Sequence, residues 1–301
     1  MAHPTPLHPR LTKRPAAHAG ANAIPRVLPV SRPGRCAAAA GAGVFDQVEH
    51  TDPFLSVDLF RRHGACIPPH PHAGCVVATY LFPESTTSLR SRHAHGGDDT
   101  LHPGDLLWLE TNCGTVHEDV PENACASVRG VRMVVSRAGQ HPHGAPVQTV
   151  VRAGSMPRWR EGDVELTLIC GRWAEHAVER NDGGCTTLLQ LDWHADAVRT
   201  LDIPCDGRRW IALIAQGDAA VAGHPLRADG NVQALLLPPG TWQLAGRSGA
   251  RLMLAGGEPL DAPVVYRGNF AARDEADLVA LTRRYQQGSM GVLTPVCVER
   301  K

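Results

Sequence analysis

The feature that most constrains the fold is a long series of short β-type runs. From Phe54 onward, apolar runs of strand length alternate with Gly, Pro and Asp turns, among them FLSVDLF, CVVATYLF, DLLWLE, TTLLQLDW and ARLMLAGG. Short strands with frequent turn residues between them are typical of all-β sandwiches and barrels. The sequence therefore predicts an all-β protein.

Two landmarks indicate that this β pattern is duplicated. Ile67-Pro68-Pro69 resembles Ile203-Pro204-Cys205, and the turn Pro103-Gly104 resembles Pro239-Gly240. Positions 67 and 203 differ by 136 residues, and so do positions 104 and 240. A chain of 301 residues has room for two domains of ordinary size. We therefore expect two tandem β barrels.

The landmarks divide the chain into four expected segments. These are a disordered Pro-, Ala- and Arg-rich arm over 1–35, an N-terminal barrel over 36–150, a C-terminal barrel over 151–291 and a tail over 292–301. The last part of the second barrel is expected to be a packing helix over 274–287. Leu278, Leu281 and Tyr285 would share one face of it, with acidic residues in its first turn and arginines in its last.

Composition limits the partners and the compartment. Thirty acidic side chains balance thirty basic ones, so no net field attracts nucleic acid or an acidic membrane. The nine cysteines are odd in number and form no C-x-x-C pair, which favours a reduced, cytoplasmic protein. No apolar run reaches the roughly 18 residues that a membrane span requires. We expect no membrane or direct nucleic-acid partner.

The candidate chemistry lies in the first half. Gly64 precedes His70-Pro71-His72 by the spacing G-x5-H-x-H, and Gly114 precedes His117 by G-x2-H, which are the two cupin signatures. Side chains alternate across a strand, so His70 and His72 should point into one barrel interior, as should His117 and Asp119. Three imidazoles and a carboxylate suit a divalent first-row metal such as Fe, Mn, Co, Ni, Cu or Zn.

Two further H-x-H pairs have the same spacing but a different context. His93 and His95, like His141 and His143, lie in segments rich in Gly and Pro, so both pairs are expected to be loop histidines. His93 and His95 are the better candidates to border the mouth of a binding pocket.

The second half offers no such set of ligands. At the offset of 136, the counterparts of His70 and His72 are Asp206 and Arg208, and the counterpart of His117 is Met253. The C-terminal barrel is therefore expected to be metal-free, acting as a scaffold or as a wall for the first site.

Consecutive motifs give the chain a family resemblance. DPFL, PPHPHAG, TYL, PGDLLWL, GTVHEDVP and RGVRMVV in the first half, and GGEPLDAPVVYRGNF and YQQG in the second, resemble motifs of the pirin family in order. The resemblance runs from about residue 45 to 291. It implies two tandem cupin (jelly-roll) barrels with a short C-terminal helix. It further implies that the N-terminal barrel binds iron or another divalent metal through H-x-H and H-x-E.

The carry-over is complete at three of the four ligand positions. His70, His72 and His117 match the family, whereas Asp119 stands where the family usually has Glu. Because Asp is one methylene shorter, it could bind the metal less well, bind through water or leave an open position. The chain also has Ala73, Cys75 and Val76 where relatives commonly have Arg, an aromatic residue and Glu, which implies a roomier and less polar pocket. Cys75 is either a reactive thiol or a small core side chain.

The resemblance suggests a function. Some bacterial pirins resemble quercetin 2,3-dioxygenases, so the leading hypothesis is a metal-dependent dioxygenase that uses O₂ on a flavonol-like or other enolic or aromatic small molecule. Fe(II) is the favoured metal, and Asp119 would be a ligand or the catalytic base. One alternative is a non-enzymatic pirin that regulates a protein partner in response to metal or redox state. Another is a metal-assisted isomerase or cyclase of a biosynthetic pathway.

Overall fold

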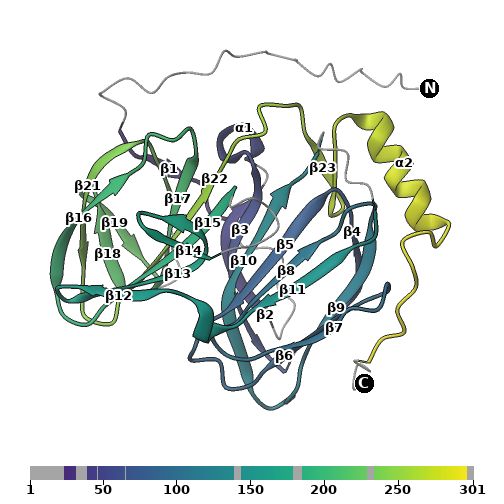
Figure 1. Cartoon of the computed structure of the whole chain (residues 1–301), viewed down its shortest axis with the longest axis horizontal. Helices are drawn as coiled ribbons and strands as arrows, with labels where there is room; N and C mark the ends of the chain where they lie inside the picture. The colour runs from purple at the N-terminus through teal and green to yellow at the C-terminus, as the bar shows by residue number, and fades with distance from the viewer. Residues whose placement is uncertain are drawn as a thin grey trace, which may run out of the picture.

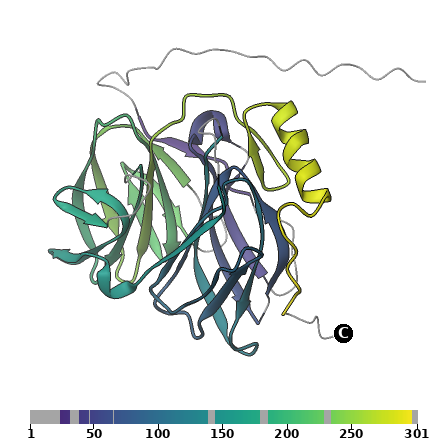
Figure 2. The same ribbon diagram turned by 45° about the vertical axis from the view of Figure 1, so that its right-hand side comes forward.

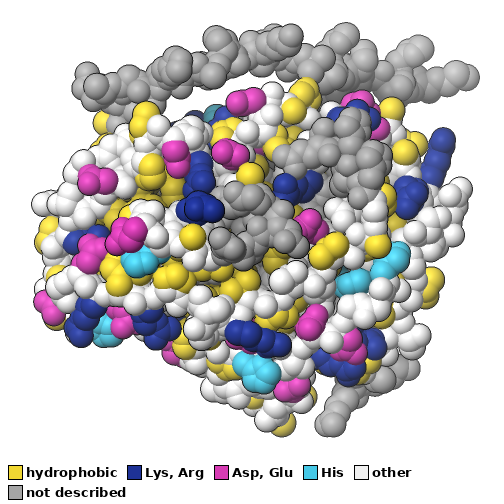
Figure 3. All heavy atoms as spheres, viewed as in Figure 1, with side chains coloured by type: hydrophobic (Ala, Val, Ile, Leu, Met, Phe, Trp, Pro, Cys, Tyr) yellow, Lys and Arg dark blue, Asp and Glu magenta, His cyan; other side chains and the backbone are white. Residues whose placement is uncertain are grey.

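The structure is a computed structural model that describes residues 24–31, 39–45, 47–64, 66–138, 144–178, 185–228 and 234–296. It confirms the predicted fold class: two β barrels lie side by side, and one short α-helix follows them (Figures 1 and 2). Each barrel is made of one larger and one smaller antiparallel sheet. On the face shown in Figure 3, acidic and basic side chains are interspersed, in keeping with the balanced charge.

The N-terminal barrel has a larger sheet of six strands and a smaller sheet of four. In spatial order the larger sheet consists of β11 (Val147–Val151), β8 (Leu106–Glu110), β5 (Cys75–Leu81), β10 (Ser127–Ser136), β3 (Phe54–His63) and β2 (Ala39–Phe45). The smaller sheet consists of β4 (Ile67–His72), β9 (Thr115–Pro121), β6 (Leu89–His93) and β7 (Asp98–Leu101).

The C-terminal barrel repeats this topology. Its larger sheet consists of β1 (Arg26–Leu28), β20 (Ala234–Leu237), β17 (Arg209–Gln216), β22 (Arg251–Gly257), β15 (Thr186–Trp193), β13 (Val164–Trp173) and β12 (Arg158–Glu161), with β14 (His176–Val178) paired to β13. Its smaller sheet consists of β16 (Ala197–Ile203), β21 (Gly240–Gly246), β18 (Asp218–Val221) and β19 (His224–Arg227). The matching strand orders support the inference of a duplicated β domain.

Two of the expected segment limits need correction. The arm expected to be disordered over 1–35 contains strand β1, whose residues pair with β20 and so join the sheet of the second barrel; residues 1–23 lie outside the described residues. Strand β11 ends at Val151 and pairs with β8, so the first barrel extends one residue beyond the expected boundary at 150. A short helix, α1 (Val48–Thr51), precedes β3, and a 3₁₀ turn at Ala153–Ser155 follows β11.

One apolar core joins the two barrels. Tyr80, Trp108 and Met133 on the larger sheet of the first barrel belong to the same buried cluster as Leu213 and Met253 on the larger sheet of the second. Burying a large apolar side chain contributes roughly 1.5–3 kcal/mol. The outer faces of the two large sheets therefore hold the barrels together, and the inner face of each sheet remains for its own barrel.

The C-terminal helix packs on a different barrel from the one expected. Helix α2 (Glu275–Gln286) forms where predicted, with the Asp274 side chain accepting a hydrogen bond from the backbone N–H of Asp277. However, Leu278 shares a buried cluster with Ala73 and Val116 of the first barrel. The helix follows the hairpin of β23 (Val265–Arg267) and β24 (Phe270–Ala272), which returns the chain to the N-terminal barrel through a bridge between Ala73 and Phe270. Helix α2 accordingly lies on the side of the first barrel away from the second (Figures 1 and 2).

Two further observations concern membrane spans and the cysteines. None of the helices within the described ranges is long and apolar enough to cross a membrane. Cys66 is disulfide-bonded, so the expectation of a fully reduced chain is wrong at this residue.

Candidate metal centre

Three imidazoles meet on the inner wall of the N-terminal barrel. His70 lies on β4 directly opposite His117 on β9, and His72 lies two residues further along β4. The ring centroids are 4.3 to 5.0 Å apart. One nitrogen of each ring can lie within 4.8 Å of the other two, which makes the three residues a candidate metal-binding group. The structure thus brings together three of the four predicted ligands.

The register of the neighbouring strands shows that these rings face the barrel interior. Across β9 and β6, His117 pairs with His93 and Asp119 with Ser91, so their side chains lie on one face of the smaller sheet. Leu89, also on that face of β6, packs in a buried cluster with residues of the larger sheet that include Leu107. The face that carries the histidines is therefore the inner one.

The unpaired nitrogens of His117 fit a bound metal. His117 is buried, and neither ring nitrogen has a hydrogen-bond partner in the described part of the chain. An unsatisfied buried polar group costs about 1–3 kcal/mol, and coordination would satisfy one nitrogen. Burial lowers the pKa of His117 to about 3 and the pKa of His72 well below its usual value. Both imidazoles are therefore neutral at pH 7, which is the form that binds metals.

Asp119 lies beside the histidines but outside the group that they form. Its Oδ1 accepts a 2.7 Å hydrogen bond from Ser91 Oγ and is 3.9 Å from His117 Nδ1. Burial alone would raise the pKa of Asp119, but His117, the Ser91 hydroxyl and Arg62 together lower it below its usual value. The carboxylate is thus ionised and oriented, and its role as a direct ligand stays a prediction.

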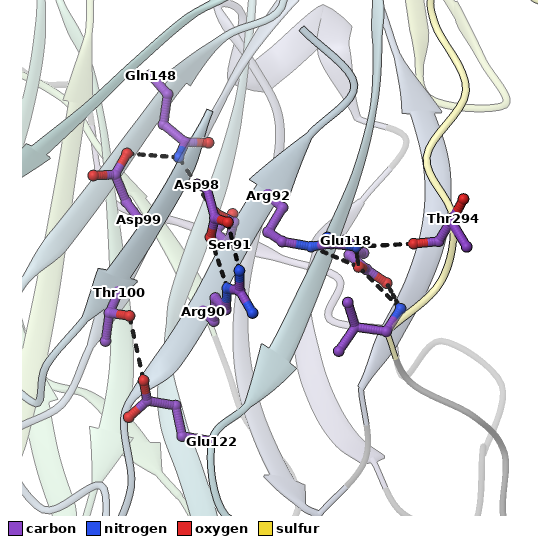
Figure 4. Close-up of polar contacts among 11 residues, drawn as sticks. Arg90, Ser91, Arg92, Asp98, Asp99, Thr100, Glu118, Glu122, Gln148 and Thr294 are labelled. Carbon is purple, nitrogen blue, oxygen red and sulfur yellow. Dashed lines mark hydrogen bonds and ion pairs between the residues drawn. The ribbon is translucent and has the colours of Figure 1, made fainter. Parts of the chain in front are cut away.

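A second set of contacts holds β9 from its outer face. Glu118, fully buried, points away from the histidines and accepts a 2.9 Å hydrogen bond from Arg92 Nε (Figure 4). Arg92 Nη2 also donates to the carbonyl of Thr294, and the backbone N–H of Val296 donates to Glu118. We call residues 288–296, which make these contacts, the C-terminal strap. It supports the strand that carries His117 and Asp119.

Gly114 of the cupin signature meets the same strap. Its φ of +112° disfavours any side chain, and a Cβ here would lie 2.5 Å from the sulfur of Met290. The backbone N–H of Val116 donates to the carbonyl of Met290. The glycine before His117 therefore lets the strap approach the strand.

The structure changes the interpretation of the other H-x-H pairs. His93 is the last residue of strand β6 rather than a loop residue, and it is 5% exposed on the inner wall opposite His117. His95 follows in the next turn, with its Nδ1 3.1 Å from Thr115 Oγ1. The tight pairing of β6 with β9 draws His93 into the sheet. His141 and His143 lie outside the described residues.

Of the three departures beside the H-x-H motif, one faces the interior. Cys75 packs in an apolar cluster with Val77 and Leu109, and burial raises the pKa of its thiol to about 12. These features support a small core side chain rather than a reactive thiol. Ala73 packs under β24, and Val76 joins the core between the barrels. The expectation that all three open the pocket is wrong for Ala73 and Val76.

The second-barrel counterparts of the ligands also need correction. The strands equivalent to β4 and β9 are β16 and β21, whose paired positions include Leu201–Trp242 and Ile203–Gly240. Leu201 and Ile203, and Leu244 further along β21, are buried. The constant offset fails because the Pro103-Gly104 turn precedes β8, whereas Pro239-Gly240 opens β21, the equivalent of β9. Asp206, Arg208 and Met253 are therefore not the equivalent positions. Leucine and isoleucine offer no metal-binding atoms, and a metal-free second barrel stays a prediction.

Sequence reasoning missed a charged group on the opposite inner wall. Arg132 on β10 lies between Asp58 on β3 and Thr79 on β5 as their cross-strand partner. Its Nη2 is 3.2 Å from Asp58 Oδ2. The available signal was the arginine in the strand RGVRMVV, where its neighbours Val131 and Met133 alternate toward the core between the barrels.

The two antiparallel barrels have the same topology, which defines a bicupin. Within the described residues, a candidate metal centre is found in the first barrel alone. The pirin C-terminal cupin domain matches residues 190–291. A Pseudomonas aeruginosa protein named as a candidate quercetin 2,3-dioxygenase is 28% identical over 259 residues, covering 81% of this chain and 88% of that protein. A pirin-like protein of Caulobacter vibrioides is 26% identical over 245 residues, covering 79% and 87%. The chain therefore resembles pirins over most of its length, as its motifs predicted.

Solved structures agree on the fold. The crystal structure of a quercetin 2,3-dioxygenase from Acinetobacter baumannii has a TM-score of 0.78 at 16% identity, covering 92% of this chain and 97% of that one. A bacterial pirin from Escherichia coli in complex with nickel(II) has a TM-score of 0.60 at 11% identity, covering 79% and 100%. At these identities the likeness concerns the fold alone.

Proposed function

We propose that the protein is a metal-dependent dioxygenase that acts on an enolic or aromatic small molecule, with Fe(II) as the favoured metal and O₂ as the second substrate. The observation that carries this proposal is the group of three imidazoles that can converge within 4.8 Å beside an ionised, buried carboxylate. The names of the relatives from Pseudomonas aeruginosa and Acinetobacter baumannii support the same reaction class.

The histidines and the aspartate of the centre have different tasks in this proposal. His70, His72 and His117 would hold the metal, which when bound would supply Lewis acidity and electron exchange with O₂. Oδ1 of Asp119 accepts a hydrogen bond from the Ser91 hydroxyl, and no described residue donates a hydrogen bond to Oδ2. That oxygen can therefore bind the metal or take the proton of an enolic substrate.

The surroundings control access of solvent to the centre. His72 and His117 are buried, whereas His70 is partly exposed and marks the side from which small molecules can arrive. The apolar clusters above and below the histidines exclude water from the rest of the barrel interior. Partial exclusion of water from the site strengthens the electrostatic interactions of a bound substrate.

The test begins with metal content and ends with gas exchange. The purified protein would be loaded separately with Fe(II), Mn, Co, Ni, Cu and Zn, and its metal measured by elemental analysis. It would then be mixed with quercetin and with a panel of other enolic and aromatic compounds in air. We expect O₂ uptake matched to substrate loss, with CO release if a flavonol is opened. A loaded protein that consumes no O₂ with any metal or compound would refute the proposal, and a ring-closed product formed without O₂ would identify an isomerase or cyclase instead.

A further inference from the structure

The interior of the N-terminal barrel is arranged in layers. One apolar layer contains Phe60, Leu81, Leu89, Leu101, Leu107 and Val128. The other contains Leu55, Cys75, Val77, Leu109, Val134 and Ala271. Along β3, β5 and β10 the inner positions between these two layers are Asp58, Thr79 and Arg132. A polar layer therefore crosses the larger sheet and faces the wall that carries the histidines.

The guanidinium of Arg132 is only partly engaged by the protein. Its Nε and Nη2 are 3.4 and 3.2 Å from the two oxygens of Asp58, so one side of the planar fork is used by rather long hydrogen bonds. No acceptor among the described residues reaches Nη1. The Arg132 side chain is 24% exposed, whereas the side chain of Asp58 is 3% exposed. One edge of the guanidinium thus remains available to a ligand.

A second donor stands next to it. Thr79, the cross-strand partner of Arg132 on β5, is 3% exposed, and its Oγ1 has no hydrogen-bond partner within the described parts of the chain. Buried hydroxyls normally have partners. An unpaired hydroxyl beside an unfilled guanidinium edge offers two hydrogen-bond donors to one position.

Arg132 and the metal centre belong to the same interior. The charge of Arg132 contributes to the lowered pKa values of His70, His72 and His117, and the charge of Asp119 contributes to the raised pKa of Arg132. A purely structural ion pair would add little here, because apolar residues in its place are often at least as stable. Placement beside the candidate centre gives the pair a use in recognition.

We propose that Arg132 and Thr79 form an anion site that selects substrates with a carboxylate or enolate next to the group that reacts at the metal. This inference rests on the proposed function for its substrate class. The ligand oxygen would accept hydrogen bonds from the free guanidinium edge and from the Thr79 hydroxyl, while Asp58 holds the other edge. Charge-assisted hydrogen bonds of this kind are about twice as strong as neutral ones.

Binding without turnover tests the site. The Zn-loaded protein would be titrated by calorimetry with salicylate and with salicylamide, which differ in the carboxylate. We expect Arg132→Gln, and the double variant Arg132→Gln/Asp58→Asn, to reduce the preference for salicylate about tenfold or more and to change salicylamide binding by less than about twofold. The double variant leaves no unpaired buried carboxylate, so it guards against a folding defect. Arg132→Lys should restore part of the preference.

The matched control is Arg90→Gln. Arg90 also forms an ion pair within this barrel, with Asp98, but on the outer face of β6 (Figure 4). This variant should keep the full preference. If the double variant keeps it as well, the inference is wrong. Because these measurements need no O₂, a lost preference would support the anion site even if dioxygenase turnover were absent, and turnover without a charge preference would refute the site alone.

Discussion

The two barrels have the same strand order, but the interior of the first carries polar side chains where the interior of the second is apolar. In the first, the positions on β4 and β9 that face inward carry His70, His72, His117 and Asp119. In the second, the equivalent strands β16 and β21 carry Leu201, Ile203 and Leu244, each at most 3% exposed. The comparison shows that the fold supplies a set of inward positions on paired strands, and that only their side chains decide between a reactive centre and a core.

The difference has an energetic side. The second barrel fills its interior with apolar contacts, which stabilise the fold. In the first barrel, imidazoles and charged groups occupy the corresponding space. Burying them costs free energy unless a ligand forms hydrogen bonds or coordination bonds with them. The shared core between the larger sheets allows the second barrel to support the first.

The strongest way to break the comparison is to remove a ligand. His72→Ala should abolish stoichiometric metal binding, because the remaining two imidazoles cannot complete the set. Elemental analysis of the purified, metal-loaded variant would show this. His141→Ala and His143→Ala should keep the metal, and an equal loss in these variants would overturn our ranking of the three H-x-H pairs.

The second prediction compares the stability lost when one side chain is truncated in each of two equivalent strands. Leu201→Ala should lower the free energy of unfolding by about 2–5 kcal/mol, because it leaves a cavity in the second barrel. His70→Ala, on the equivalent strand of the first barrel, should cost less than about 1 kcal/mol in the metal-free protein, since His70 is partly exposed. Urea denaturation measures both. Equal losses would mean that the first interior is as well packed as the second.

The third prediction concerns pH. The pKa of His117 is about 3 in the folded chain and near 6.5 in the unfolded one, so the unfolded state binds the extra proton between these values. The metal-free protein should therefore be fully stable with respect to this group above pH 6.5. This group alone should cost about 1.4 kcal/mol of stability per pH unit as the pH falls toward 3, and the lowered pKa values of His70 and His72 add to that loss. Urea titrations at several pH values would reveal the slope, and His117→Leu should reduce it; an unchanged slope would contradict the assignment.

The smallest effect is expected at Ser91, whose hydroxyl donates a hydrogen bond to Asp119. Ser91→Ala removes the hydroxyl that orients the carboxylate and should weaken metal affinity roughly tenfold, about 1.4 kcal/mol. Competition with a chelator of known affinity would measure it. Ser91→Thr keeps the hydroxyl and should retain most of the affinity. If Ser91→Ala has no effect, Asp119 does not depend on this hydrogen bond.

Local spacing explains how much of this could be predicted from the sequence. The period of a strand places His70 with His72 and His117 with Asp119, and the capping and amphipathic pattern places helix α2 within one residue of its ends. Neither pattern specifies which distant strands become neighbours. For that reason the equivalence of β9 with β21, the docking of α2 on the first barrel and the position of Arg132 opposite the histidines were not predictable. They depend on loop lengths and on the pairing of β10 with β3 and β5.

The C-terminal strap has a consequence for the order in which the protein is assembled. Met290, Thr294 and Val296 support the outer side of the strand that bears His117, yet they are synthesised after the whole of the second barrel. During translation, the wall behind the candidate metal centre therefore remains incomplete until almost the entire described chain has emerged from the ribosome. Stable metal uptake is accordingly expected as a late event in maturation. Removing residues of the strap, or attaching a tag next to it, is expected to disturb the candidate centre through the contacts of the strap with β9.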